Sequence, residues 1–188
     1  MTSHYIDLTV VPDAETSAPQ LLGALYDKLH RALAQQRLGS IGVSFPHYSV
    51  VPKSLGNTLR LHGEAAMLRQ FLATDWLKGI RDHLRMTEIV AVPANAVHRV
   101  VQRRQFKTSA ERLRRRRMKR KGETAEQAAR AIPIAIERKP NLPYVRLHSL
   151  SSSQPFHLFV ALGPPQELPI PGHFNSYGLS PIATIPWF

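Results

Sequence analysis

Residues 112–121, RLRRRRMKRK, carry eight positive charges and no acidic side chain in ten positions. From Arg103 to Lys121 the chain has eleven lysines or arginines and one acid, a net of +10 out of +12 for all 188 residues. Such a run cannot enter a core, because each buried charge would need a partner. The rest of the chain is close to neutral and long enough to form a core. We therefore expect one basic segment and a globular scaffold.

The basic segment is predicted to be a helix over residues 110–121, with Ser109 as its cap and Gly122 as its stop. Only Leu113 and Met118 interrupt the charges with apolar side chains, so we expect the helix to find its partner outside the protein. Guanidinium groups bond phosphate or a guanine edge at two points, which favours nucleic acid. An anionic membrane surface is the least favoured partner, because the helix lacks an aromatic or leucine face. The charge alone does not choose between DNA and RNA, and a solvated, nonspecific face is the alternative.

Composition excludes several other site types. The chain has no cysteine, which rules out disulfides and thiolate metal sites. No two of its nine histidines lie within four residues of each other, and its acids are scattered, so we expect no metal and no other cofactor. No apolar run approaches the length of a membrane span, and the start does not look like a signal peptide. A cytoplasmic protein without a membrane partner is expected.

Hydrophobic periodicity in the first half predicts the β-α-β-β-α-β order of a ferredoxin-like fold. In the first helix the apolar side chains recur at three and four spacing and predict one buried stripe; they are Leu22, Leu25, Tyr26, Leu29 and Leu33. Strands are expected at 4–11, 40–46, 58–63 and 87–93, and helices at 19–36 and 64–73, with helical structure continuing over 76–84. Later elements are a helix at 123–132 and strands at 144–151, 155–162 and 173–180. The fold class is α+β.

Six segments, in order and spacing, resemble the CRISPR precursor-RNA-processing endoribonuclease of type I-F systems. They are DKLHRAL (27–33), IGVSFP (41–46), QRRQFK (102–107), SAERLRRR (109–116), SYGLS (176–180) and IPWF (185–188). The resemblance implies a ferredoxin-like domain at 1–95 and a smaller RNA-binding region at 96–188 that contains the arginine-rich helix. It also implies a role in antiviral defence. Such enzymes bind the repeat stem-loop, cut at its 3′ foot without a metal, and stay on the guide RNA.

The partners that the resemblance implies are the CRISPR repeat hairpin, the mature guide RNA and the other subunits of the type I-F surveillance complex, with a monomer when alone. It implies His30 for proton transfer, Ser149 to hold the 2′-hydroxyl, and Tyr177 to orient His30 by hydrogen bonding. Whether His30 acts as base or acid stays open, as does the register of the serine within 149–153. The expected products have a 2′,3′-cyclic phosphate (or 3′-phosphate) and a 5′-hydroxyl. Judged alone, these side chains could be a half-buried helix histidine, a strand-end serine and a core tyrosine.

RNA contacts are implied in three places. Arg103 and Gln105 match a pair that reads base edges near the foot of the stem, which suits arginine for guanine and glutamine for adenine. Phe156 is expected to stack under the last base pair, with Phe159 as its competitor, and Ser151 to support Ser149. On the helix Arg115, Arg116, Lys119 and Arg120 share a face and match groove-binding positions, and Arg112 and Arg114 are expected on phosphate or in solvent. His148 stands where a basic residue is expected.

Two other functions remain open at this point. A catalytically inactive subunit that only binds the RNA hairpin would keep the arginine helix and lack competence at His30 or Ser149. A basic architectural nucleic-acid-binding protein would explain the charge but not His30, Ser149 and Tyr177 together.

Overall fold

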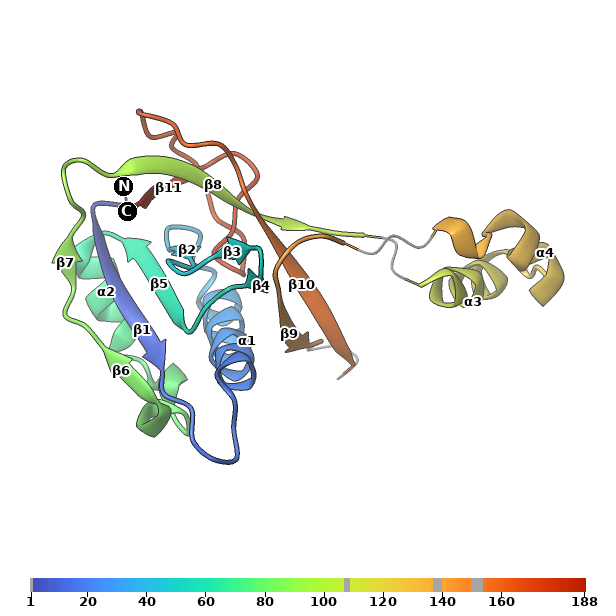
Figure 1. The fold of residues 1–188 in the computed structure, drawn as a ribbon, viewed down its shortest axis with the longest axis horizontal. Coiled ribbons are helices and arrows are strands. Elements are labelled where there is room, and N and C mark those ends of the chain that lie inside the picture. The colour runs from blue at the N-terminus through green and yellow to red at the C-terminus, as the bar shows by residue number, and fades with distance from the viewer. Residues whose placement is uncertain (1, 107–108, 137–139, 150–153) are drawn as a thin grey trace. The chain divides into compact units, whose positions relative to one another are not determined.

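The computed structural model describes residues 2–106, 109–136, 140–149 and 154–188 (Figure 1). Its elements in chain order are β1 (His4–Val10), α1 (Ala18–Gln36), β2 (Gly42–Ser44), β3 (Ser49–Val50), β4 (Lys53–Ser54), β5 (Thr58–Gly63), α2 (Ala65–Leu72), the 3₁₀ turns η1 (Asp75–Leu77) and η2 (Arg81–His83), β6 (Leu84–Met86), β7 (Val90–Ala91), β8 (Val97–Arg104), α3 (Ala110–Lys121), α4 (Ala125–Ala131), η3 (Ile134–Ile136), β9 (Tyr144–His148), β10 (Pro155–Leu162) and β11 (Thr184–Trp187). In the part of the chain that the structure describes, no helix combines the length and apolarity needed to cross a bilayer.

By its internal contacts the chain divides into two compact units. One contains Met1–Arg104 with Leu142–Phe188, and the other contains Gln105–Asn141. The strands after residue 142 thus group with the N-terminal fold. These units do not coincide with the ranges 1–95 and 96–188 expected from sequence, whose division of roles stays a prediction.

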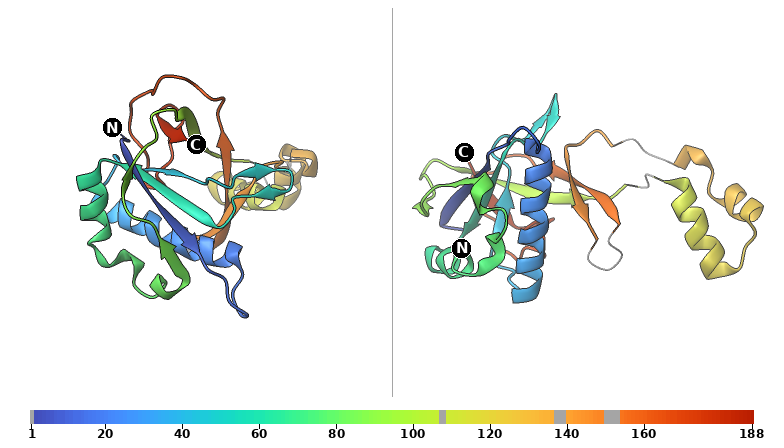
Figure 2. Two further views of the ribbon diagram at one scale, coloured as in Figure 1. Left: turned by 60° about the vertical axis from the view of Figure 1, so that its left-hand side comes forward. Right: turned by 90° about the horizontal axis from the view of Figure 1, so that it is seen from below.

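The first sheet of the larger unit has the strand order β2-β5-β1-β6, and β7 also pairs with β1. Its β1 alternates as predicted, with Ile6, Leu8 and Val10 buried. Helices α1 and α2 both contact β1 and β5 and cover one face of this sheet (Figures 1 and 2). The α+β class is confirmed, and the β-α-β-β-α-β order gives the ferredoxin-like arrangement.

Helix α1 begins with a capping box, in which the Gln20 side chain accepts the Ser17 backbone N–H at 2.9 Å. The predicted stripe is buried in full, together with Leu21, Gly23 and Ala32. Gly23 allows a close approach, because an added Cβ would lie 2.7 Å from the carbonyl oxygen of Arg146 in β9. The helix is therefore fixed between the first sheet and the edge of the second.

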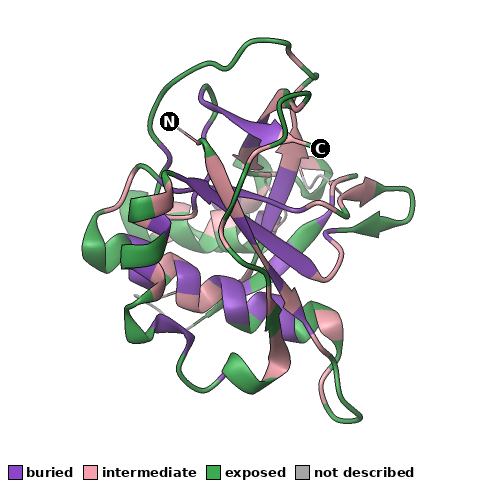
Figure 3. Cartoon of the chain, turned by 90° about the vertical axis from the view of Figure 1, so that its left-hand side faces the viewer, coloured by how far each residue is buried: buried purple, intermediate pink, exposed green. Residues whose placement is uncertain are grey.

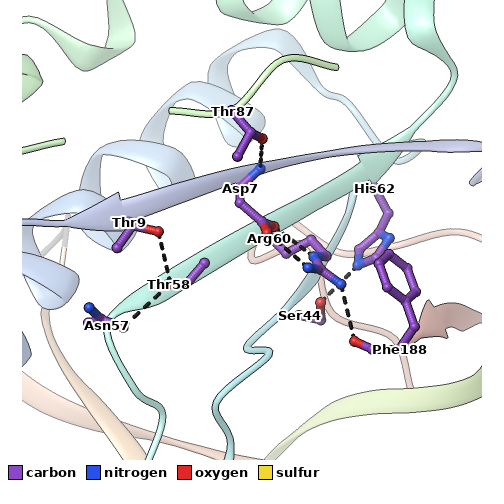
Figure 4. Close-up of polar contacts among 9 residues, drawn as sticks. All are labelled: Asp7, Thr9, Ser44, Asn57, Thr58, Arg60, His62, Thr87 and Phe188. Atoms are coloured by element: carbon purple, nitrogen blue, oxygen red, sulfur yellow. Dashed lines mark hydrogen bonds and ion pairs between the residues drawn. The ribbon is translucent and has the colours of Figure 1, made fainter. Parts of the chain in front are cut away.

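Strand β5 is buried along its whole length, as Figure 3 shows, although it contains an arginine. Arg60 forms two bonds to Asp7, with Nε to Oδ1 at 2.6 Å and a terminal nitrogen to Oδ2 at 2.8 Å (Figure 4). Its guanidinium also lies over the rings of Tyr5 and Phe188, at 4.5 and 4.1 Å from their centroids. The buried charge is thus paired and surrounded, which is the condition for keeping it inside a core.

The second sheet of the larger unit has the order β11-β8-β10-β9, with every pairing antiparallel. Arg103 of β8 lies opposite Val160 of β10, and Phe156 of β10 lies opposite Leu147 of β9. Helix α1 contacts β9, and β11 contacts β2, so the two sheets share one core.

Two strand predictions were wrong in detail, and β11 was missed. The strand expected at 87–93 is replaced by β6 and β7, because Leu84–Met86 pairs with β1 instead. The segment 173–180 is a turn rather than a strand, since Asn175 and Gly178 fold it back on itself.

In the smaller unit, α3 begins and ends where the sequence predicted. The Ser109 side chain accepts the Arg112 N–H, and Gly122 ends the helix with φ +67°. The expectation that α3 finds its partner outside the protein stays a prediction, although the helix also has partners within its own unit. It contacts α4 and η3, and Ala110 and Ala128 are buried there. The small alanine side chains permit this contact between the helices, which the low number of apolar residues in α3 had not suggested.

Candidate functional site

The site is built on the carboxyl-terminal half of α1, where half-buried His30 lies at the edge of the buried stripe. Its Nδ1 is 2.9 Å from the backbone carbonyl oxygen of Ser176. A carbonyl only accepts, so Nδ1 carries the hydrogen of this bond. In the neutral ring, Nε2 is then left with a lone pair and can accept a proton.

The ring of His30 is also held by Tyr177. The two rings are stacked, with centroids 3.8 Å apart and planes 8° from parallel. We had expected a hydrogen bond from Tyr177 to orient His30. The contact recorded between them is this stack, and the hydrogen bond comes from the neighbouring Ser176 carbonyl. The hydrogen bond thus limits movement of the His30 ring within its plane, and the stack limits movement perpendicular to that plane.

The loop that provides these contacts is itself fixed to α1. The Tyr26 hydroxyl donates to the carbonyl oxygen of Tyr177 at 2.7 Å, one turn before His30. The Asn175 side-chain oxygen accepts the N–H groups of Tyr177 and Leu179 at 2.8 and 3.3 Å. Gly178 has φ +68°, and a Cβ there would lie 2.3 Å from Val43.

Tyr26 is a positioning residue that sequence reasoning treated only as core. Burial raises the pKa of its hydroxyl well above its usual value, with a further increase from Tyr177 that Arg103 opposes. The hydroxyl therefore stays protonated and remains a donor. The signal was available, since a fully buried tyrosine hydroxyl needs an acceptor and Tyr26 lies four residues before His30.

Arg103 continues the cluster from β8. Its guanidinium carbon lies 5.3 Å from the Tyr177 ring centroid and 5.6 Å from that of Phe156. Both distances are within cation–π range. The structure therefore brings together four of the predicted residues, His30, Tyr177, Arg103 and Phe156, in a continuous series of ring contacts.

Ser149 follows the last residue of β9 and is half-buried. Its N–H donates to the carbonyl oxygen of Gln154 at 2.9 Å. The preceding residue, His148, is tied to α1: its backbone N–H lies 3.1 Å from both carboxylate oxygens of Asp27, and its Nδ1 lies 3.2 Å from one of them. Asp27 lies one turn before His30 on α1. Its bonds to His148 therefore connect α1, which carries His30, with the end of β9, which Ser149 follows. Ser151 lies outside the described residues.

The arginines of α3 fall into two sets. The predicted RNA contacts are all exposed; they are Arg112, Arg115, Arg116, Lys119 and Arg120. Arg114 and Arg117 are less exposed and have partners in the smaller unit. Arg114 Nε donates to the Ile132 carbonyl at 2.8 Å, and Arg117 bonds both carboxylate oxygens of Glu123 at 2.5 and 3.0 Å. Arg114, expected with Arg112 on phosphate or in solvent, thus has a partner within the chain. Gln105, just after β8, is exposed.

Residues 5–188 match the model of a family described as CRISPR-associated protein (Cas_Csy4). The chain belongs to this family. It is 43% identical over 185 residues to the CRISPR-associated endonuclease Cas6/Csy4 of Escherichia coli (strain UTI89 / UPEC), which covers 98% of this chain and 99% of that protein. It is 44% identical over 185 residues, with the same coverage, to the CRISPR-associated endonuclease Cas6/Csy4 of Pseudomonas aeruginosa (strain UCBPP-PA14). The family resemblance inferred from six segments is confirmed.

In the part of this Csy4-family chain that the structure describes, no group of three or more histidine, aspartate or glutamate side chains is arranged to hold an ion. The histidines near the site have other contacts, His30 with Ser176 and His148 with Asp27.

Proposed function

We propose that this chain is an endoribonuclease that binds the stem-loop of a CRISPR repeat and cuts the precursor RNA at the 3′ foot of the stem. The observation that carries the proposal is the fixed imidazole of His30, with Nδ1–H on the Ser176 carbonyl and its ring on Tyr177. The family and the two relatives named as endonucleases support the same reaction class.

In the proposed reaction the RNA supplies its own nucleophile. His30 Nε2 takes the proton of the 2′-hydroxyl, and the 2′-oxygen attacks the adjacent phosphorus. The bond between phosphorus and the 5′-oxygen breaks, and this oxygen takes a proton from water. The products are a 2′,3′-cyclic phosphate and a 5′-hydroxyl, and no metal takes part. The tautomer set by Ser176 favours the role of base over that of acid, the choice that the sequence left open.

The other residues have proposed roles in alignment. Ser149 holds the 2′-hydroxyl in line with the phosphate, which supplies the orientation that such an attack requires. Phe156, half-buried and beside Arg103, stacks under the last base pair and sets the place of the cut. Arg103 and Gln105 read base edges at the foot of the stem.

The exposed set on α3 is proposed to bind the hairpin. A basic helix cannot enter the deep major groove of a long RNA duplex, but the groove opens near a loop or a helix end. The five exposed cations then contact phosphates and base edges, while Arg114 and Arg117 hold the helix to its own unit. This strong contact would keep the product RNA bound in the cytoplasm, where we propose that the chain serves as a subunit of the surveillance complex.

The test is a cleavage assay with a labelled repeat hairpin in excess EDTA. Wild-type protein, His30→Ala, and wild-type protein with a 2′-deoxy nucleotide upstream of the cut are compared. We expect cleavage in the first reaction only, with a cyclic phosphate on the product. Tight binding without any cleavage would instead indicate a non-cutting hairpin-binding subunit, and equal affinity for duplex DNA would indicate an architectural protein.

A further inference from the structure

Helix α1 and strand β9 meet in the larger unit through two positions on the helix. Strand β9 is at the edge of the second sheet, and an edge strand presents backbone N–H and C=O groups that a neighbouring element has to cover. Helix α1 contacts this strand. Gly23 permits the close approach to the Arg146 carbonyl, and one turn further along the helix Asp27 accepts the backbone N–H of His148.

Asp27 is the one acidic residue of α1, and its side chain is directed at β9 rather than at solvent. The side chain is 12% exposed, against 55% for that of His148. Both carboxylate oxygens lie 3.1 Å from the backbone nitrogen of His148, and Oδ2 lies 3.2 Å from Nδ1 of the same residue. A carboxylate covered to this extent is costly unless it is hydrogen-bonded. The end of β9 provides the bonds that Asp27 needs.

The two contacts determine how α1 and β9 are aligned along their length. From Gly23 to Asp27 the helix rises about 6 Å. From Arg146 to His148 the strand advances about 7 Å. The contacts follow the same order in both elements, so the helix and the strand run in the same direction and advance by nearly equal amounts. Neither element can shift along the other without losing the Asp27 bonds.

The next position on each element belongs to the proposed reaction. His30 lies about 4.5 Å further along the helix than Asp27. Ser149 lies about 3.3 Å further along the chain than His148. The two levels therefore agree to about 1 Å. The N–H of Ser149 donates to the Gln154 carbonyl oxygen, so the backbone here is held from the side of β10 as well as from α1.

We propose that Asp27 is a positioning residue for cleavage, which holds the end of β9 so that Ser149 lies level with His30. The inference rests on the proposed function, in which Ser149 aligns the 2′-hydroxyl and His30 removes its proton. Neither role requires Asp27 to touch the RNA. A displacement of about 1 Å in the reacting groups can slow such an attack by about a hundredfold. Loss of the Asp27 bonds should therefore lower the rate of cleavage and leave the affinity for the hairpin unchanged.

The experiment measures single-turnover cleavage of a labelled repeat hairpin, and the dissociation constant of the same hairpin blocked by a 2′-deoxy nucleotide at the cut. The proteins are wild type, Asp27→Ala, Asp27→Asn, Ser149→Ala and the double variant of Asp27→Ala with Ser149→Ala. Asparagine removes the charge but keeps an oxygen that accepts the His148 N–H. The matched control is Asp82→Ala, which removes an exposed acid from η2 and changes the net charge by the same amount.

We expect Asp27→Ala to slow cleavage by about tenfold to a hundredfold, with hairpin affinity within about twofold of wild type. Asp27→Asn should retain most of the rate, and Asp82→Ala should retain all of it. In the Ser149→Ala background, Asp27→Ala should slow cleavage further by less than about twofold, because the effects of residues that act as a unit do not add. A general loss of stability would instead slow both backgrounds equally.

Wild-type protein that binds the hairpin without cutting it would refute the proposed function. If wild type cuts, the role of Asp27 alone is overturned by a rate for Asp27→Ala or Ser149→Ala close to that of wild type. Equal losses in Asp27→Ala and Asp27→Asn, or the full loss from Asp27→Ala repeated in the Ser149→Ala background, would overturn it as well. If Ser149→Ala cuts too slowly to measure, the comparison of Asp27→Ala with Asp27→Asn decides.

Discussion

Helices α1 and α3 both carry polar side chains with proposed roles in a reaction on RNA, yet the two helices are held in place by opposite means. Helix α1 buries a stripe of leucines, and its one histidine is fixed by a carbonyl and a stacked ring. Helix α3 buries little beyond Ala110 and displays five cations, while two arginines turn to partners within its unit.

The difference follows from what each task demands. Proton transfer depends on the geometry of one atom, so the ring must be held by the surrounding structure before the substrate arrives. Attraction to phosphates acts over several ångströms and sums over many charges, so α3 needs only a stable helix. Each prediction below changes one of the two helices or its support and leaves the other unaltered.

The largest effect is expected for His30→Ala. Removing the proton acceptor should slow cleavage by about 10²–10⁴-fold, the usual contribution of general acid–base catalysis. Affinity for the uncut hairpin should stay within about twofold, since the exposed cations of α3 are unchanged. Single-turnover rates and a binding titration measure the two quantities. A rate close to that of wild type would show that α1 does not carry the chemistry.

Acid should destabilise the larger unit before it destabilises the smaller one. Burial, with a smaller contribution from Arg60, lowers the pKa of His62 to about 3, against 6.5 for the unperturbed side chain. Between about pH 6.5 and about pH 3, the unfolded chain therefore binds a proton at His62 that the folded chain does not bind. The free energy of unfolding of the larger unit should fall by up to about 1.4 kcal/mol per pH unit from about 6.5 towards 3.

The smaller unit should respond later. A hydrogen bond from Arg117 is the main cause that lowers the pKa of Glu123, so their ion pair persists below the usual range of a carboxylate. Hydrogen exchange at several pH values, corrected for intrinsic rates, should show α1 losing protection before α3. His62→Gln should flatten the response of α1. An unchanged slope in that variant would assign the acid sensitivity to another group.

The two arginine sets on α3 can be compared directly with Arg116→Ala and Arg114→Ala, two residues apart. Arg116→Ala should weaken hairpin binding and reduce the slope of log affinity against log salt by about one. Arg114→Ala removes the bond to the Ile132 carbonyl and should instead reduce the exchange protection of α3. If both variants lost the same affinity and the same slope, the division into exposed and anchoring arginines would be incorrect.

The smallest effect is expected for Tyr26→Phe. This change keeps the buried ring but leaves the Tyr177 carbonyl without the 2.7 Å donor. It should cost about 1 kcal/mol in the free energy of unfolding and slow cleavage without changing hairpin affinity. Denaturant titration and single-turnover rates provide the readouts. Val10→Ala, which removes core volume in β1 away from the loop, is the matched control and should cost stability without slowing cleavage.

Local sequence signals predicted the elements that are stabilised locally. The leucine stripe predicted α1 to within one residue, and Ser109 with Gly122 bounded α3. Both signals lie within the helix or directly at its ends. The site residues came instead from the family resemblance, because nothing in the spacing of His30, Tyr177 and Arg103 along the chain shows that their rings meet.

The errors lie where distant segments decide the structure. Strand β11 contains Pro186, which argues against a strand, but β11 is at the edge of its sheet, where proline is tolerated. The segment around Tyr177 alternates like a strand, yet Asn175 accepts two backbone N–H groups and Tyr26 fixes it from α1. The β8 partner of β11 and Tyr26 are both more than seventy residues away, out of reach of a local pattern, whereas the Asn175 turn is local and was missed.

The pairing of β10 has a consequence for how this family could diversify. Phe159 of β10 lies between Arg104 of β8 and Tyr144 of β9. The chain therefore leaves the larger unit at the end of β8 and returns to it just before β9, with only β10 between these two points. Two strand spacings amount to about 10 Å, a gap that a short turn can bridge. Residues 105–141 could therefore be exchanged as one segment, and such an exchange would replace the helix proposed to bind the hairpin while leaving the proposed catalytic residues in place.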